Sequence, residues 1–416
     1  MDAKRSTAPL VAGLCAATLL ATVIGYAQAP AAPAAGQAPA AAGQGAAGGG
    51  RGGGRGGVQP QAPSSLDLRQ MLAAVPEKAP ATPAQPRRVL VLGRAAGFVH
   101  SSIPLAARTV EALGANTGSW TTTITFNPAD INTANLANYD LVFLASTTGS
   151  FLDDPTDAAA TDARKKALLD FVRGGKGLAG VHAATDSYHG GGNRGGGAGA
   201  AGAPGAAAPG QPAAGAGRAA GAGAPAAAPA AAAAGGGRGG QTVEACNFAP
   251  GSTTPGNAGG APLWPEFNVM IGGYFKWHWN MPTHVYLKVD EPAHPLNAPF
   301  VTTNAQGVVT PRSISVLDEV YTFNETSFSR KRSRVLTSID YSKMPLCVRA
   351  QEPAPQRTDH DYALSYIQKE GNGRVFVLVL GHDEGIYKIR PILEHMLAGI
   401  QYAIGDLKAD DSPSVK

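Results

Sequence analysis

The stretch RVLVLGRAAGFVHSSIPLAARTVEALG, residues 88–114, decides the fold class of this chain of 416 residues. Its first part, residues 88–93, is an apolar run of strand length, which is typical of a strand buried on both faces of a parallel sheet. Ser101 and Ser102 can cap the following helix, whose apolar residues recur on one face until Gly114 ends it. A buried strand joined to an amphipathic helix is half of a βαβ unit, so the stretch predicts a parallel sheet covered by helices.

Similar strand and helix patterns continue toward the C-terminus. Further predicted strands are residues 121–126, 140–145, 177–182, 285–289, 313–323, 335–339, 363–367 and 374–380, and further predicted helices are residues 161–173 and 389–404. Right-handed crossovers between such strands give an α/β fold with a flavodoxin-like, doubly wound, mostly parallel sheet. We expect this sheet and its helices to form a single domain over residues 87–406.

Two tracts rich in alanine, glycine and proline flank and interrupt the predicted domain, at residues 30–86 and 190–260. Apart from a short amphipathic stretch at residues 66–75, they hold too few apolar side chains for a core. We therefore predict a disordered linker and a disordered insertion. A tenfold longer loop costs only about 2 kcal/mol in closure entropy, so one domain can contain the insertion if its borders meet in space. Residues 407–416 are predicted to form a polar tail.

The N-terminal residues 1–29 have the pattern of a secretory signal peptide. Lys4 and Arg5 precede an apolar run that ends in the small-residue pattern Ala27-Gln-Ala29. This predicts a periplasmic or secreted protein with no membrane association beyond the signal segment. In an oxidising compartment, Cys246 and Cys347 can form a disulfide if the fold brings them close.

Charge and glycine patterns exclude two classes of partner. The formal net charge is only +4, and part of the positive excess comes from arginines scattered in glycine tracts instead of clustered on one helix face, so we expect no nucleic-acid partner. The loop Gly93-Arg-Ala-Ala-Gly97 lacks both the spacing of a dinucleotide fingerprint and the lysine of a P-loop. We therefore expect no nucleotide cofactor.

Three predicted strands each deliver a histidine to the same edge of the sheet. His100 follows the first strand, His182 with Asp186 and His189 ends strand 177–182, and His382 follows strand 374–380. Ligands of open parallel sheets bind beyond the carboxyl ends of the strands. Imidazole is also a common ligand of zinc. The pattern predicts a shared site that could hold a divalent metal ion such as zinc.

Additional candidate residues occur in the second half of the chain. His278 lies between two tryptophans, and Glu319 lies close to a tyrosine. Aromatic side chains with polar tips suit a sugar ring, and a carboxylate near imidazoles can serve as general base or orient a metal-bound histidine. The predicted residues are His182, Asp186, Glu319 and His382 for catalysis, Phe98, Trp277, Trp279 and Tyr321 for substrate binding, and His100, His182, His278 and His382 for metal binding.

Several of these motifs together resemble one known family. The matching segments are Gly97-Phe-Val-His100, Gly174-Gly-Lys-Gly-Leu-Ala-Gly-Val-His182, Gly272-Gly-Tyr-Phe, His278, His294-Pro295, Asp318-Glu319-Val-Tyr321, Gly373-Arg-Val-Phe and Gly381-His382. In this order they resemble the ThuA-like family, named for trehalose utilisation and similar in fold to class I glutamine amidotransferases. The resemblance extends from residue 88 to about residue 405, apart from the insertion. It implies a role in carbohydrate metabolism, with a sugar, keto-sugar or glycoside as ligand.

The resemblance does not imply glutaminase activity. In the amidotransferase relatives, the tight turn after the corresponding strand carries a nucleophilic cysteine, whereas this sequence has His182 there. Without a thiol at this turn, no thioester route to ammonia release exists.

Three interpretations of the histidine-rich cleft are open at this stage. The first is a metal-dependent hydrolase or lyase acting on sugars, with Asp186 or Glu319 as base or as the group that orients a ligand. The second is a binding module that holds a glycan without changing it. The third is metal-free acid–base catalysis by His182, oriented by a hydrogen bond with Asp186.

Overall fold

A computed structural model describes residues 54–55, 59–190, 261–279, 283–323, 327–352 and 357–414, all within a unit that spans residues 51–416. The predicted signal peptide, about half of the predicted linker (residues 30–53 and 56–58), nearly all of the insertion and Cys246 lie outside the described residues. Among the described residues, no helix is both long enough and apolar enough to cross a membrane.

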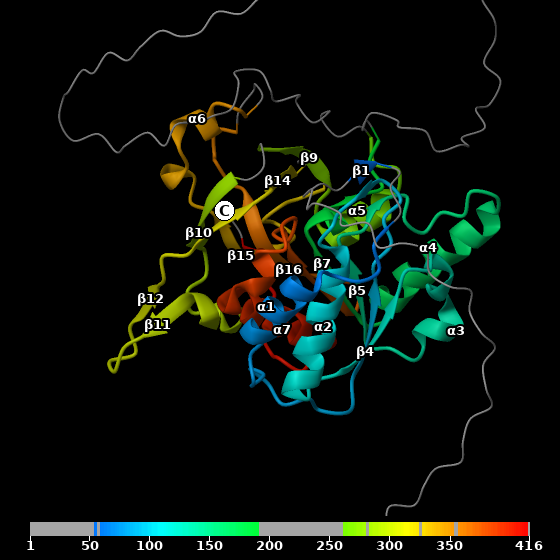
Figure 1. Cartoon of the computed structure of the whole chain (residues 1–416), viewed down its shortest axis with the longest axis horizontal. Helices are drawn as coiled ribbons and strands as arrows, with labels where there is room; N and C mark the ends of the chain where they lie inside the picture. The colour runs from blue at the N-terminus through cyan, green and yellow to red at the C-terminus, as the bar shows by residue number, and fades with distance from the viewer. Residues whose placement is uncertain are drawn as a thin grey trace, which may run out of the picture. The chain divides into compact units, whose positions relative to one another are not determined.

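The domain is built on a nine-stranded sheet (Figure 1). Its strands, in spatial order, are β13 (Ser315–Asp318), β10 (Thr283–Val289), β15 (Arg334–Ile339), β16 (Ala363–Glu370), β17 (Gly373–Leu378), β7 (Gly177–Val181), β5 (Leu141–Ala145), β2 (Arg88–Leu92) and β4 (Thr121–Thr125). The pairs from β17 to β4 are parallel, and those from β13 to β17 are antiparallel. Only β16 and β10 therefore run against the other strands of this sheet. The predicted α/β class with a mostly parallel sheet is confirmed, and the sheet is mixed.

Helices pack on both faces of the parallel strands. The helices α1 (Ser65–Ala74), α2 (Ile103–Thr117) and α7 (Arg390–Ile404) contribute to one apolar core, and α3 (Thr133–Leu136), α4 (Ala158–Arg173) and α5 (Pro265–Ile271) contribute to the other. Successive residues of β2 alternate between these cores, with Val89 in the first and Leu90 in the second. Because β2 is buried on both faces, its sequence is an unbroken run of apolar residues after Arg88.

The remaining elements are short. The helix α6 spans Leu346–Arg349. The other described strands form two-stranded sheets, which pair β1 (Gly54–Arg55) with β3 (Phe98–Val99), β6 (Thr148–Gly149) with β8 (Asp186–Ser187), β9 (Phe275–His278) with β14 (Tyr321–Phe323), and β11 (Val301–Thr303) with β12 (Val309–Pro311). The predicted strand 313–323 is therefore wrong as one element. It divides into β13, in the large sheet, and β14, which pairs with β9.

The ordered domain is longer than the sequence pattern predicted. The helix α1 lies in the predicted linker, yet its Met71 is fully buried in the first core. At the other end, Ser414 of the predicted tail donates its backbone N–H to the carbonyl of Ser333, and the Ser414 hydroxyl accepts from the N–H of Val335. Both segments belong to the fold because they cover apolar or hydrogen-bonding groups that would otherwise face solvent.

The borders of the long insertion meet, as predicted. The N–H of Gly190 donates to the carbonyl of Ala261 over 3.0 Å, and the N–H of Leu263 donates to the carbonyl of Tyr188 over 2.8 Å. The chain therefore leaves and re-enters the domain at one place, so the large sheet is not interrupted.

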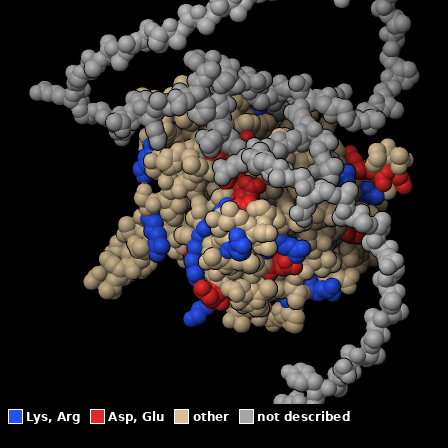
Figure 2. Space-filling model, in the orientation of Figure 1, with Lys and Arg blue, Asp and Glu red and all other residues tan. Residues whose placement is uncertain are grey.

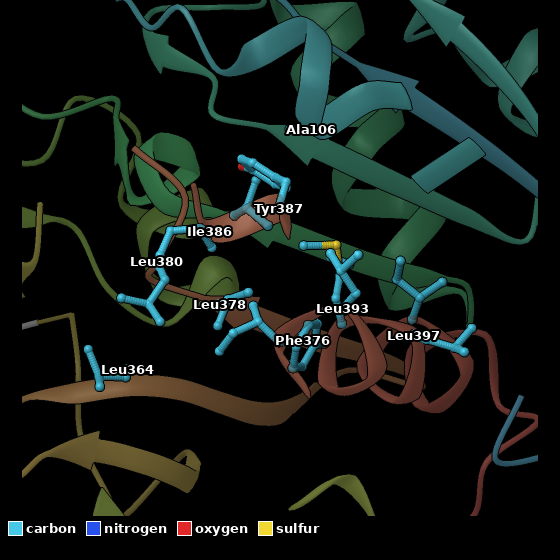
Figure 3. Close-up of a cluster of buried hydrophobic side chains, with 14 of the residues drawn as sticks. Ala106, Leu364, Phe376, Leu378, Leu380, Ile386, Tyr387, Leu393 and Leu397 are labelled. Carbon is cyan, nitrogen blue, oxygen red and sulfur yellow. The ribbon is translucent and has the colours of Figure 1, made fainter. Parts of the chain in front are cut away.

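Packing between β17 and α7 supports the loop that follows β17. Figure 3 shows Phe376 and Leu378 of the strand beside Leu393 and Leu397 of the helix, with Tyr387 near the end of the loop. All five side chains are buried. On the face drawn in Figure 2, basic and acidic side chains are interspersed among larger uncharged areas.

Candidate metal centre

His182 occupies a sharp turn at the carboxyl end of β7. Its backbone φ of 44° lies in the left-handed region, which is costly for any residue but glycine. Gly180 permits the turn, because a Cβ atom there would lie 2.7 Å from the Cβ of Ala184. The His182 Nδ1 lies 3.1 Å from the carbonyl of Val379 and donates to it, so Nε2 keeps its lone pair toward the site.

The loop after β17 is held by the buried side chain of Asp318. Its Oδ2 accepts from the N–H of Gly381 over 2.6 Å, and its Oδ1 accepts from the N–H of Asp383 over 2.9 Å. Gly381 has a φ of 128°, and a Cβ atom there would lie 2.5 Å from the hydroxyl oxygen of Tyr387. These contacts orient His382, between the two bonded N–H groups. Sequence reasoning named Asp318 only as part of a motif and missed this role.

His100 completes the group of histidines. It lies between β3 and α2, and its ring centroid is 4.8 Å from those of both His182 and His382. Its buried Nδ1 has no hydrogen-bond partner among the described residues. Phe98 packs against His100 at 4.8 Å. A buried nitrogen without a partner is costly, so the geometry leaves room for a ligand to that nitrogen.

Glu319 brings a carboxylate to the histidines. Its Oε1 lies 3.3 Å from the His382 Nδ1 and 3.7 Å from the His182 Nε2, and those two nitrogens are 3.2 Å apart. The possible ligand atoms of His100, His182, Glu319 and His382 all lie within 4.8 Å of one another. Three imidazoles and one carboxylate are a zinc-type ligand set, so these residues fit a divalent ion.

The electrostatics of this four-residue cluster suit a cation. Burial lowers the pKa of His100 to about 3 and that of His182 well below its usual value, so both rings are neutral. Burial opposes ionisation of Glu319, but its hydrogen bond with His382 and its electrostatic interactions with the neighbouring imidazoles outweigh burial and lower its pKa. Burial would lower the pKa of His382, but its hydrogen bond and charge interaction with Glu319 raise it. The raised pKa of His382 favours a proton on its ring beside the carboxylate when no metal is bound.

His278 lies beside this cluster and outside it. Its Nδ1 lies 2.8 Å from the carbonyl of Trp279, to which it donates, and 3.5 Å from the Oε2 of Glu319. Its side chain is 35% exposed, whereas the side chain of His182 is fully buried. The structure groups Glu319, and not the predicted His278, with the other three candidate ligands.

Asp186 does not orient His182. Its carboxylate instead accepts a hydrogen bond from the Nε2 of His189, and no hydrogen bond joins Asp186 to His182 in the described part of the chain. The predicted contact is wrong because the left-handed turn at His182 directs its Nδ1 to the neighbouring strand end, at Val379.

The predicted aromatic residues have different surroundings. The ring of Tyr321 packs 4.4 Å from that of His182. Trp277 and Trp279 are only 3% and 0% exposed, and both belong to the first apolar core, so they do not form the predicted wall of a cleft. The half-buried Phe275, which sequence reasoning missed, lies 4.8 Å from Tyr321 and 5.7 Å from His278, measured between ring centroids.

The fold and the site define an α/β protein with a histidine and carboxylate cluster at the carboxyl edge of a mixed sheet. The ThuA family model, described as trehalose utilisation, matches residues 88–208 and 256–403. The chain therefore belongs to the ThuA family. This confirms the resemblance inferred from the sequence.

Solved structures of two ThuA-like proteins are similar to this chain. The one from Bacteroides uniformis ATCC 8492 is 16% identical, with a TM-score of 0.45, and the match covers 78% of this chain and 94% of that one. The one from Parabacteroides merdae ATCC 43184 is 12% identical, with a TM-score of 0.37, and the match covers 80% of this chain and 96% of that one. No curated protein matches the chain significantly.

Proposed function

We propose that this protein is a divalent-metal-dependent enzyme of carbohydrate metabolism, a hydrolase or lyase that acts on a sugar, keto-sugar or glycoside. The observation that carries the proposal is the cluster of His100, His182, Glu319 and His382, whose ligand atoms lie within 4.8 Å of one another. Membership of the trehalose-utilisation family supports a carbohydrate substrate. The same turn that carries a cysteine in glutaminases carries His182 here, which argues against glutamine hydrolysis.

A zinc ion at this cluster would polarise a sugar carbonyl or hydroxyl group, or lower the pKa of a bound water. The cluster is prepared for a cation because His100 and His182 are neutral while Glu319 is ionised. Metal binding competes with protonation of the histidine ligands, and the raised pKa of His382 strengthens this competition, so metal affinity would rise with pH.

His278 is the best placed group for proton exchange with a substrate. Its Nδ1 proton is directed to the carbonyl of Trp279, which leaves Nε2 as the basic nitrogen of a half-exposed ring. Glu319 approaches the same ring through Oε2, while its Oε1 faces His182 and His382. One carboxylate would thus link the metal ligands to the proton-transfer group.

Asp186 remains a second candidate for acid–base catalysis, now with His189 as the residue that positions it. The two side chains are hydrogen-bonded and both are partly exposed. The charge of Asp186 contributes to raising the pKa of Tyr321, after the larger effects of burial and of Glu319, which indicates that Asp186 lies near the tyrosine.

Aromatic rings beside the cluster would contact the sugar. Phe98 packs on His100, and Phe275 packs on Tyr321 and lies near His278, and both phenylalanines are half-buried. Such rings favour the apolar faces of a sugar, and the histidines can bond its hydroxyl groups.

The wider setting of the proposed enzyme follows from the sequence and topology. The spatial order β4-β2-β5-β7-β17, with helices on both faces, supports a flavodoxin-like, doubly wound core in a single domain. The N-terminal pattern of Lys4, Arg5 and Ala27-Gln-Ala29 supports export to the periplasm or beyond the cell.

The proposal is tested by turnover with and without metal. The purified protein is stripped with a chelator, reloaded with zinc, manganese or magnesium, and incubated with a panel of keto-sugars and glycosides. We expect activity only after reloading, and its loss in His100→Ala. The control is His284→Ala, because His284 packs on Tyr286 in β10 and is not one of the cluster residues.

Two outcomes would favour other interpretations. Activity that survives complete chelation would favour metal-free acid–base catalysis. A sugar that raises the melting temperature but is recovered unchanged after long incubation would favour the alternative of a glycan-binding module.

A further inference from the structure

An open hollow lies at the same edge of the sheet as the metal cluster, beside the carboxyl ends of β2 and β4. It has a volume of about 460 Å³ and is lined by Gln61, Arg94 and residues 124–128. This volume falls within the range of small-molecule sites, and the carboxyl edge of parallel strands is where such sites occur. None of its lining residues belongs to the cluster of His100, His182, Glu319 and His382.

Among the described residues, Arg94 is the only charged one that lines this hollow. Its Nε is buried and has no hydrogen-bond partner there, and no carboxylate of the described chain forms an ion pair with its guanidinium group. Several other arginines of the domain form ion pairs, such as Arg87 with Asp406 and Arg164 with Asp154, whereas Arg332 also has buried nitrogens without a partner. A buried donor without an acceptor is costly, so Arg94 keeps a donor for an acceptor that the described chain does not supply.

The rest of the lining is neutral, and two of its side chains are amides that can donate hydrogen bonds. The Oδ1 of Asn127 accepts from the N–H of Ala129, which leaves the amide NH₂ group of Asn127 as a donor. Gln61 adds a second amide. The hydroxyl of Thr125 donates to Asp130, the carboxylate adjoining this lining, and accepts from the N–H of Asn127, so it is already satisfied.

We propose that this hollow binds a small oxyanion, a phosphate or carboxylate group, with Arg94 as its anchor and Asn127 as a second donor. A guanidinium group binds such anions through two parallel hydrogen bonds, which neutral amides alone cannot provide. The oxyanion is either a free ion or the acidic substituent of a sugar. Arg94 lies between β2 and β3, and His100 follows β3, so both come after the carboxyl end of β2 and a sugar acid or sugar phosphate bound here would lie on the substrate side of the sheet. The inference does not depend on metal binding.

Calorimetric titration of the purified chain with inorganic phosphate, glucose 6-phosphate and glucuronate tests this site. We expect at least one of these anions to bind, and Arg94→Gln to weaken its binding by about tenfold or more, the usual effect of removing a hydrogen bond to a charged group. The matched control is Arg108→Gln, because Arg108 is exposed on α2 and paired with Glu111. It should bind like the unchanged protein.

Two further comparisons show whether the anion is a free ion or part of a sugar, and whether a negative result concerns this site or the metal centre. A sugar anion that binds much more tightly than phosphate assigns the site to a sugar substituent, and equal affinities assign it to a free ion. Zinc content and melting temperature should not change in Arg94→Gln, so failure at this site is distinguishable from failure of the metal centre. The proposal is overturned if none of the three anions binds, or if Arg94→Gln binds them as well as Arg108→Gln does.

Discussion

Replacing Asp318 with asparagine should change how the stability of the metal-free protein depends on pH. Burial raises the pKa of the Asp318 carboxyl from its ordinary value of 3.8 to about 7, although Gly381 and Asp383 donate hydrogen bonds to it. Between these two pH values, the folded state holds a proton that the unfolded state has released. The free energy of unfolding therefore falls as the pH rises through this window.

The size of the effect follows from the same two pKa values. A difference of about 3 pH units corresponds to about 4 kcal/mol at 1.4 kcal/mol per unit. An asparagine side chain cannot titrate, so the free energy of unfolding of Asp318→Asn should not show this decrease. Between pH 4 and pH 8 the variant should therefore gain up to about 4 kcal/mol in free energy of unfolding relative to the unchanged protein. In thermal unfolding this corresponds to a relative change in melting temperature of about 8–16 °C.

The assay is urea or thermal unfolding of both metal-free proteins at half-unit steps from pH 4 to pH 8. The variant should still lose activity, because an amide offers one acceptor where Gly381 and Asp383 require two, and His382 then loses its orientation. Stability curves that stay parallel over the whole range would refute the reasoning, since they would mean that the carboxylate keeps its ordinary pKa.

Three other perturbations test the fold that positions the site. Gly180→Ala places a Cβ atom 2.7 Å from that of Ala184, and should cost about 1–3 kcal/mol in urea unfolding; a fully stable variant would contradict the need for glycine at this turn. Gly399→Ala in α7 should be destabilising by a similar amount, despite the better helix propensity of alanine, because its Cβ would lie 2.4 Å from the ring of Phe376; calorimetry showing an unchanged melting temperature would count against this packing. Deletion of residues 191–240, which keeps Cys246, should leave the circular dichroism spectrum and melting temperature nearly unchanged, because the borders of the insertion are already hydrogen-bonded; insoluble or unfolded protein would oppose it.

Local patterns were sufficient to predict the parallel part of the fold. The strand at residues 88–92 and the helix after it are defined by neighbours in sequence, through continuous apolar character and helical spacing. Strand ends of a parallel sheet share one edge, so the meeting of His100, His182 and His382 could also be predicted.

The parts that could not be predicted depend on contacts between distant segments. Glu319 was predicted as a catalytic carboxylate, but its place among the possible ligands depends on the division of the predicted strand after Asp318, whose carboxylate accepts hydrogen bonds from the loop after β17. The burial of Trp279 depends on packing against Tyr362, which lies far along the chain. Helix α1 was assigned to the linker because its surroundings are rich in alanine and proline, and only its packing in the core reveals it as part of the domain.

Elemental analysis of the tag-free protein tests the central claim most directly. The unchanged protein, Glu319→Gln and the double variant His182→Ala/His382→Ala are compared after equilibration with zinc and removal of free ions. The account predicts close to one zinc ion per chain, much less in Glu319→Gln and none in the double variant, with the control His284→Ala unchanged. No bound metal in the unchanged protein after ions are added back, or the same metal content in every variant, would contradict it.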